Sequence, residues 1–148
     1  MDLSAFRNKI SVHVRFNDVD MLGVCNNAVY INFFDEGRLS YMKESGLVPE
    51  TGLFTDGSLY FVVRNEINYR SYAHYGDDLN LYTRVSWIKN SSFGFEHVVE
   101  NNQTKEIIAD GSCVLVHVDA ETRRPVNLPG FFIDKVFAYD SQIEMIKE

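Results

Sequence analysis

The feature that most constrains the fold of this chain is one helical run, residues 26–46, with the sequence NNAVYINFFDEGRLSYMKESG. One side of the run carries mostly aromatic residues at helical spacing: Tyr30, Phe33, Phe34, Gly37 and Tyr41. A second side is aliphatic and carries Val29, Ile31 and Leu39. A helix that is apolar over most of its circumference must be buried on several sides. We therefore expect the rest of the chain to wrap around it.

The two ends of the predicted helix have their own signals. Asn26 or Asn27 can cap the first turn, because a short polar side chain accepts a hydrogen bond from a free backbone N–H. Gly46 can end the helix, because glycine adopts the left-handed backbone conformation without steric cost.

Strand-like runs lie on both sides of this helix in the sequence. Val12, Val14 and Phe16 alternate with polar residues, which predicts a half-buried strand before the helix. Four more runs follow the helix, at residues 59–70, 79–88, 92–100 and 105–119. The turn-type sequences HYGDD, KNSS and NNQT separate these four runs, so the last three predict an antiparallel meander.

The remaining segments are two loops, residues 48–58 and 120–130, and a short helix predicted at 131–139. One strand, one buried helix and four further strands indicate the α+β class, with a sheet wrapped around the central helix. Such a sheet has open edges, and oligomerisation would cover them.

Length and composition limit the classes of function. A chain of 148 residues predicts one domain, 1–148, and its net charge of −7 argues against nucleic acid as the main partner, because phosphate binding needs a basic face. No apolar run approaches the roughly 18–20 residues of a membrane span, and the N-terminus lacks the apolar core of a signal peptide. We expect a cytoplasmic protein in which Cys25 and Cys113 are reduced thiols.

The stretch RFNDVDMLGVCNN, residues 15–27, places two acids directly before the predicted helix. Gly23 allows the chain to turn back, so that Asp20 and the helix start face the same spot. The first turn of a helix has unpaired N–H groups and a partial positive charge. From this pattern alone Asp20 either caps the turn or offers a carboxylate for catalysis.

Three segments together resemble the 4-hydroxybenzoyl-CoA thioesterase family of hotdog-fold proteins, which includes the acyl-CoA thioesterases associated with the Tol–Pal system. The first is RFNDVDMLGVCNNAVYINFFDEGRLSYM, with an Asp-x-Asp, a glycine and an Asn-Asn pair before the helix. The second is INYRSYAHYGDDLNLYTRV, and the third is VDAETRRPVNLP. They follow the family's order over about residues 8–130.

The resemblance implies a hotdog fold, with an antiparallel sheet of five to six strands around the long helix, in homodimers often paired into homotetramers. It implies hydrolysis of an acyl- or aryl-CoA thioester at the dimer interface, with no cofactor, because CoA is part of the substrate. The catalytic aspartate of the family's motif corresponds to Asp20, whereas Asp18 has no counterpart with a role in that motif and is expected to be structural. The backbone amide that polarises the thioester carbonyl corresponds to Asn27. Asp20 would be a nucleophile or a general base, and both routes stay open.

Further substrate contacts are expected at both ends of the ligand. Gly23, Asn26 and Tyr30 are candidates near the thioester, although Asn26 is also the natural helix cap. The CoA phosphates need cations, and the candidates are Lys89, Arg123 and Arg124; a solvated surface is the equal alternative for each.

The sequence departs from the family at Val24-Cys25, where many members have His-Val, so a histidine that holds substrate or water in those members has no counterpart here. Cys25 has no activating histidine nearby in the sequence and fits a core residue. For Glu36, an ion pair with Arg38, Arg64 or another cation is favoured over a role as a second catalytic carboxylate.

The four histidines have neither metal-ligand spacing nor a recurrent acidic partner, so we expect no metal site. The same lack of a histidine near the helix start disfavours a hydratase on this fold. Two alternatives to an acyl-CoA thioesterase remain: an acyl carrier protein (acyl-ACP) thioesterase, and a non-catalytic hotdog protein that binds acyl thioesters.

Overall fold

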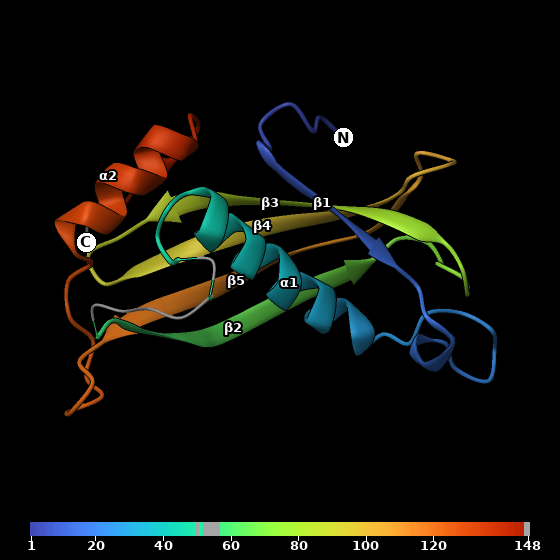
Figure 1. The fold of residues 1–148 in the computed structure, drawn as a ribbon, viewed down its shortest axis with the longest axis horizontal. Coiled ribbons are helices and arrows are strands. Elements are labelled where there is room, and N and C mark those ends of the chain that lie inside the picture. Colours follow the sequence, from blue (N-terminus) through green and yellow to red (C-terminus); the bar gives the residue numbers. More distant parts are fainter. Residues whose placement is uncertain (50, 52–56, 147–148) are drawn as a thin grey trace.

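The computed structural model describes residues 1–49, 51 and 57–146. Figure 1 shows one long helix, α1, lying across a face of a sheet, and a second helix, α2, at one end of the sheet. The elements in chain order are β1 (Asn8–His13), the 3-10 turn η1 (Phe16–Asp18), α1 (Val29–Glu44), β2 (Leu59–Tyr69), β3 (Asp78–Ile88), β4 (Ser92–Asn101), β5 (Ile107–Val118), α2 (Gly130–Tyr139) and β6 (Glu144–Met145).

The sheet has the strand order β1-β3-β4-β5-β2, and all neighbours on this path are antiparallel. The short β6 pairs in parallel with the end of β3, a strand that the sequence pattern did not predict. The predicted α+β hotdog architecture, a sheet around a central helix, is confirmed. The four runs predicted as strands after the helix correspond to β2–β5, and the predicted C-terminal helix corresponds to α2.

The aromatic side of α1 faces the sheet, as its spacing predicts. Phe34 and Tyr41 are fully buried. Gly37 sits where the helix comes closest to β3: a Cβ atom there would lie 2.4 Å from Thr83 Oγ1 and 2.9 Å from Leu81 Cδ2. Such contacts are far shorter than van der Waals separation, so the missing side chain sets how closely the helix packs.

The aliphatic side of α1 is not covered within one chain. The side chains of Ile31 and Leu39 are 38% and 43% exposed. The prediction that this helix is buried on several sides is therefore wrong for the single chain, because its aromatic side packs on the sheet while its aliphatic side stays partly exposed.

The first strand ends earlier than its alternation predicted. Val12 and Val14 are buried as expected, but Phe16 is 79% exposed and belongs to η1. The cause is local. The backbone N–H of Arg15 and its guanidinium Nε and Nη2 all donate to the Asp18 carboxylate, and these hydrogen bonds bend the chain out of the extended conformation. The C-terminal end of α1 agrees better with prediction, since Gly46 has a φ of +83°. The predicted 48–58 loop lies partly outside the described residues.

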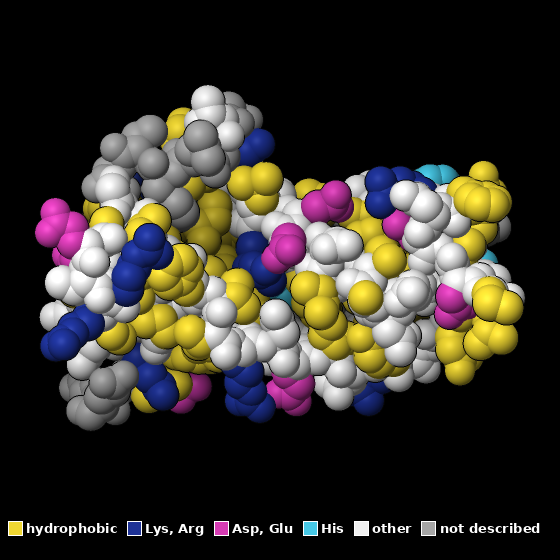
Figure 2. All heavy atoms as spheres, turned by 90° about the horizontal axis from the view of Figure 1, so that it is seen from below, with side chains coloured by type: hydrophobic (Ala, Val, Ile, Leu, Met, Phe, Trp, Pro, Cys, Tyr) yellow, Lys and Arg dark blue, Asp and Glu magenta, His cyan; other side chains and the backbone are white. Residues whose placement is uncertain are grey.

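Strand β2 leaves one edge of the sheet unpaired within the described part of the chain, because β5 is its sole neighbour there. Several of its large apolar side chains are 40–60% exposed: Phe61, Val62, Val63 and Tyr69. Figure 2 views the molecule from the side on which β2 lies, and shows hydrophobic side chains on this face and inside a hollow in it. No helix among the described residues is long and apolar enough to cross a membrane.

Candidate active site

The chain between η1 and α1 forms a small hairpin that carries Asp20. The Asp20 N–H donates to the Val24 carbonyl (2.9 Å), and the Asn26 N–H donates to the Asp18 carbonyl (2.8 Å). The Gly23 N–H closes the turn by donating to the Asp20 carbonyl (3.0 Å), and Gly23 has a φ of +79°. A short hairpin loop with glycine in the left-handed conformation is a common turn, and it confirms that Gly23 turns the chain back.

Asp18 is the structural acid of the pair, as predicted. Its side chain is 4% exposed, and its carboxylate accepts hydrogen bonds from the Arg15 backbone N–H (2.9 Å), Nε (3.1 Å) and Nη2 (3.0 Å). The hydrogen bonds from Arg15 hold the pKa of Asp18 below its usual value. Both oxygens are engaged, so Asp18 has no carboxylate oxygen left for a substrate.

Asp20 lies in the opposite environment, at the exposed tip of the hairpin. Its Oδ1 accepts the Leu22 N–H at 2.8 Å, so the carboxylate does cap its own turn. Its Oδ2 accepts no hydrogen bond from any described residue. Capping and catalysis are therefore compatible at this residue: one oxygen fixes the side chain and the other faces solvent.

The start of α1 lies directly after this hairpin. The Asn26 Oδ1 accepts the Ala28 N–H at 3.0 Å and the Asn26 carbonyl accepts the Val29 N–H at 2.9 Å, so Asn26 closes the turn that leads into α1. The N-cap residue itself is Ala28, which has no side-chain cap, so the predicted cap at Asn26 or Asn27 lies too early in the chain. The Asn27 carbonyl accepts a hydrogen bond from the Tyr69 hydroxyl at 3.1 Å. Within the described part of the chain, the Asn27 N–H has no acceptor, so this donor is available at the positive end of the helix.

Tyr30 and Cys25 lie beneath the hairpin rather than at its surface. Tyr30 is 2% exposed, and its ring makes edge contacts with Phe33 and Tyr69. Cys25 is 4% exposed, and burial raises the pKa of its thiol to about 11. The thiolate is the reactive form of cysteine, so this position fits a core residue and not a nucleophile. Substrate contacts of Gly23, Asn26 and Tyr30 stay predictions.

A third short segment, from the connection between β2 and β3, runs alongside the hairpin. The Cys25 N–H donates to the Ala73 carbonyl at 2.8 Å, and Val24 forms an antiparallel bridge with His74. The His74 Nδ1 lies 3.7 Å from the Asp77 Oδ2. We did not select His74 from the sequence. Its only signal there is the GDD turn that follows it and supplies Asp77.

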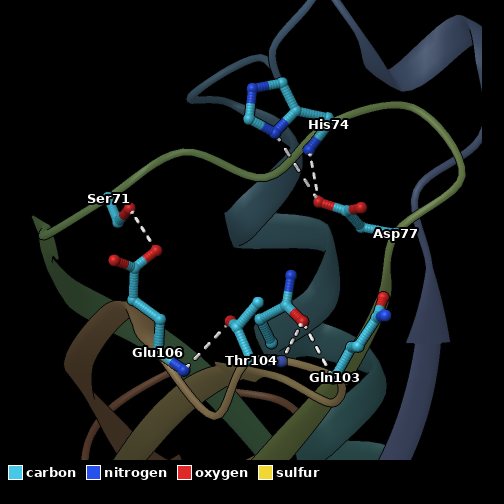
Figure 3. Close-up of polar contacts among 7 residues, drawn as sticks. Ser71, His74, Asp77, Gln103, Thr104 and Glu106 are labelled. Atoms are coloured by element: carbon cyan, nitrogen blue, oxygen red, sulfur yellow. Dashed lines mark hydrogen bonds and ion pairs between the residues drawn. The ribbon is translucent and has the colours of Figure 1, made fainter.

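Figure 3 shows that Ser71, His74 and Asp77 do not form a Ser–His–Asp triad, although all three residue types occur in this connection. The Ser71 hydroxyl donates to the Glu106 Oε1 at 2.7 Å, on the β4–β5 side. The Asp77 carboxylate accepts the His74 backbone N–H at 2.8 Å. The serine thus braces two loops, and the histidine and aspartate belong to the turn beside the hairpin.

The three predicted cations lie at the other end of the sheet from Asp20. Lys89 is in the β3–β4 turn, where its ammonium lies 5.3 Å from the centre of the Trp87 ring. Arg123 and Arg124 follow β5, and the Arg123 guanidinium lies 5.4 Å from the centre of the Phe61 ring, at the β2 edge. Strand β3 has 11 residues and spans about 33 Å between the two ends. One chain therefore does not bring these cations to its own Asp20.

The predicted ion pair of Glu36 with Arg38 or Arg64 is wrong. Glu36 is exposed, and the two arginines have other partners, since Arg38 binds Asp35 and Arg64 binds Glu66. Because the Glu36 carboxylate is exposed, it stays solvated and needs no cation to offset a desolvation cost.

Two histidines also have acidic neighbours that the sequence did not reveal. The His13 Nδ1 lies 2.8 Å from the Asp78 Oδ1, and His74 lies beside Asp77. Among the residues that the structure describes, no three His, Cys, Asp or Glu side chains gather as metal ligands would.

Comparison with known proteins adds a family to this geometry. A model described as the thioesterase-like superfamily matches residues 14–136. The acyl-CoA thioesterase YbgC of Haemophilus influenzae is 29% identical over 119 residues, which cover 80% of this chain and 85% of YbgC.

Two solved structures resemble the whole chain. A thioesterase from Thermus thermophilus, solved in complex with coenzyme A and Zn, has a TM-score of 0.76 and 31% identity, and the match covers 92% of this chain and 96% of that one. The PA5185 protein of Pseudomonas aeruginosa strain PAO1 has a TM-score of 0.81 and 25% identity, with 96% and 97% covered.

Proposed function

Because the chain belongs to the thioesterase-like superfamily and is a thioester hydrolase, we propose that it hydrolyses an acyl- or aryl-CoA thioester to the free acid and CoA. The observation that carries this proposal is that one hairpin holds a carboxylate oxygen and leads into a helix start with a backbone N–H, neither of them hydrogen-bonded to any described residue. A thioester hydrolase needs these two groups: a base or nucleophile, and a donor for the developing oxyanion.

Asp20 and Asn27 have complementary roles in this proposal. The Asn27 N–H donates to the thioester oxygen and stabilises the negative charge that develops on it. Asp20 is ionised at neutral pH, because the reference pKa of an aspartate is about 3.9. It takes a proton from the attacking water, the water oxygen bonds to the carbonyl carbon, and the C–S bond breaks. The CoA thiolate then takes up the proton. In the nucleophilic alternative, the Asp20 oxygen bonds to the carbonyl carbon first and the C–S bond breaks, which releases the CoA thiolate. Water then cleaves the resulting anhydride to the free acid and the Asp20 carboxylate, and the thiolate takes up the proton that the water loses.

We propose further that the site is shared between two subunits that pair along β2. Tyr69, at one end of β2, contacts Asn27, whereas Phe61, near the other end, contacts Arg123. A twofold axis through the middle of this strand would set the Tyr69 end of one subunit beside the Phe61 end of its partner. The thioester would then lie at one subunit's Asp20 and the nucleotide phosphates near the cations of the other. Such pairing would also cover the exposed apolar edge of β2.

Coenzyme A is favoured over an acyl carrier protein as the thiol carrier. A carrier protein is acidic and needs an extensive basic surface, whereas this chain has a net charge of −7. Three cations near one ligand are enough for a nucleotide, and arginine matches phosphate through its fork of donors.

The test is thiol release from aryl-, short-chain and long-chain acyl-CoA esters, measured with the wild type and with Asp20→Asn. We expect hydrolysis of at least one class and a loss of at least about 100-fold in kcat for Asp20→Asn, a change that keeps the Leu22 cap. Asp18→Asn is the matched control two residues away. Full activity of Asp20→Asn would refute the role of its carboxylate. Binding of acyl-CoA without turnover by the wild type would favour the non-catalytic alternative.

A further inference from the structure

His74 lies in a row of three side chains with Val24 and Asp20. The bridge between Val19 and Cys25, together with the bond from Asp20 N–H to the Val24 carbonyl, sets Asp20 and Val24 opposite each other across the hairpin. The bond from Cys25 N–H to the Ala73 carbonyl makes Val24 and His74 a non-hydrogen-bonded pair, the type with the closest side chains. Paired residues of antiparallel strands point to the same face. Asp20, Val24 and His74 therefore share one face.

That face is the outer one. Cys25 and Ala73, the neighbours of Val24 and His74 in the chain, are 4% and 0% exposed and point to the core. Alternation along each segment then directs His74 and Asp20 to solvent, and the His74 side chain is 63% exposed. The two pair spacings place the Cα atoms of Asp20 and His74 about 10 Å apart. Only Val24 lies between Asp20 and His74 on this face. When both side chains lean over Val24, the gap between the carboxylate and the imidazole has room for about one bridging water.

Asp77 lies on the Nδ1 side of this histidine. Its Oδ2 lies 3.7 Å from the His74 Nδ1, beyond hydrogen-bonding distance, and accepts the His74 backbone N–H at 2.8 Å. A carboxylate on that side of the ring favours the tautomer with its proton on Nδ1, which leaves Nε2 as an acceptor.

We propose that His74 holds the hydrolytic water beside Asp20, with Val24 as the floor of the water site. This inference rests on the proposed thioesterase function and selects its general-base route. The water donates one O–H to the Asp20 Oδ2 and the other to the His74 Nε2, so its oxygen lone pairs face the thioester carbon. During attack the proton on the Asp20 side moves to the carboxylate and later to the departing thiolate. His74 keeps its protonation state and contributes position.

The test compares thiol release by His74→Ala, His74→Gln and the wild type. His74→Ala should lower kcat by roughly 10- to 100-fold with a much smaller change in KM, because the substitution removes the hydrogen bond that positions the water but leaves every contact with CoA in place. His74→Gln places an amide oxygen near the position of Nε2 and should restore most of that loss. The backbone contacts of residue 74 with Asp77 and Val24 stay in all variants, and unchanged thermal unfolding checks this.

His13→Ala is the matched control, because His13 is also an exposed histidine beside a carboxylate, Asp78. Its kcat and KM should stay within about twofold of the wild-type values. The water site is overturned if His74→Ala keeps the wild-type kcat, or if His74→Ala and His13→Ala lose the same amount of activity. In either case Asp20→Asn still tests the proposed function separately. A wild type that releases no thiol from any acyl-CoA refutes the proposed function and this inference together.

Discussion

Asp18 and Asp20 are separated by one residue and have opposite roles, because the hairpin turns one inward and the other outward. Asp18 engages Arg15 with both oxygens, whereas one Asp20 oxygen accepts no hydrogen bond from a described residue. The family resemblance suggested this division, and backbone geometry explains it: Asp18 precedes the hairpin turn and Asp20 forms it.

The Asp18 interaction predicts a pH dependence of stability. Because the folded-state pKa of Asp18 is lowered by Arg15, its contribution is present above about pH 4, the pKa of an unfolded aspartate, and is lost as the pH falls through the lower folded-state value. Asp18→Asn should cost about 1 kcal/mol at pH 7, a low value because the Arg15 side chain is 66% exposed.

Urea unfolding of the wild type and Asp18→Asn at pH 7 and pH 3 measures this effect. The gap between the two proteins should shrink at the lower pH. A gap that stays the same at both values would contradict the proposed linkage.

Helix α1 is positioned by one missing side chain. A Cβ at Gly37 would collide with Thr83 and Leu81, so the helix can lie this close to β3 only with glycine. The same helix presents its N-terminal amides to the hairpin, and its distance from the sheet therefore sets where the Asn27 N–H lies.

Gly37→Ala should destabilise the fold by about 1–3 kcal/mol, through overpacking against β3. The measurement is the free energy of unfolding in urea. Gly130→Ala is the control, since a Cβ there meets no atom within 4 Å. Equal unfolding free energies for Gly37→Ala and the wild type would show that β3 can yield at no cost.

The whole molecule keeps the proposed thioester and nucleotide ends of the site apart. The hairpin between β1 and α1, which carries Asp20, lies at one end of the sheet, and the β3–β4 turn and the segment after β5, which carry the three cations, lie at the other (Figure 1). The unpaired β2 edge and the exposed residues Ile31 and Leu39 of α1 leave apolar surface that a second subunit would bury.

A shared site predicts complementation between two defective variants. One is Asp20→Asn; the other combines Arg123→Asn with Arg124→Ala, because asparagine tolerates the φ of +62° at position 123. Each should be impaired alone. When equal amounts are unfolded and refolded together, half of the dimers are mixed and each has one intact site, so about a quarter of the wild-type activity should return.

Mixing each variant with itself is the control for refolding. A mixture no more active than its two components, or a chain that elutes as a monomer in size-exclusion chromatography, would contradict the shared site.

Much of the fold follows from local pattern. The aromatic spacing at Phe34 and Tyr41 predicted α1 and its buried side, and the turn signals at Gly23 and Gly46 were confirmed by their positive φ angles. Such features depend on residues close together in the chain, so the sequence carries them directly. Phe16 was misassigned because a side-chain contact between Arg15 and Asp18 overrode the alternation.

By itself, the sequence determined the element order, the buried helix face and the pairing of an acid with a helix start. Only the tertiary structure decided what lies beside Asp20, because contacts between segments that are distant in the sequence depend on the topology and register of the strands. It set His74 next to Val24, left Glu36 without an ion pair to Arg38 or Arg64, and put the predicted phosphate-binding cations at the opposite end of a sheet whose strand β3 spans about 33 Å. Local pattern fixes which surfaces are apolar, and chain topology fixes which of them meet.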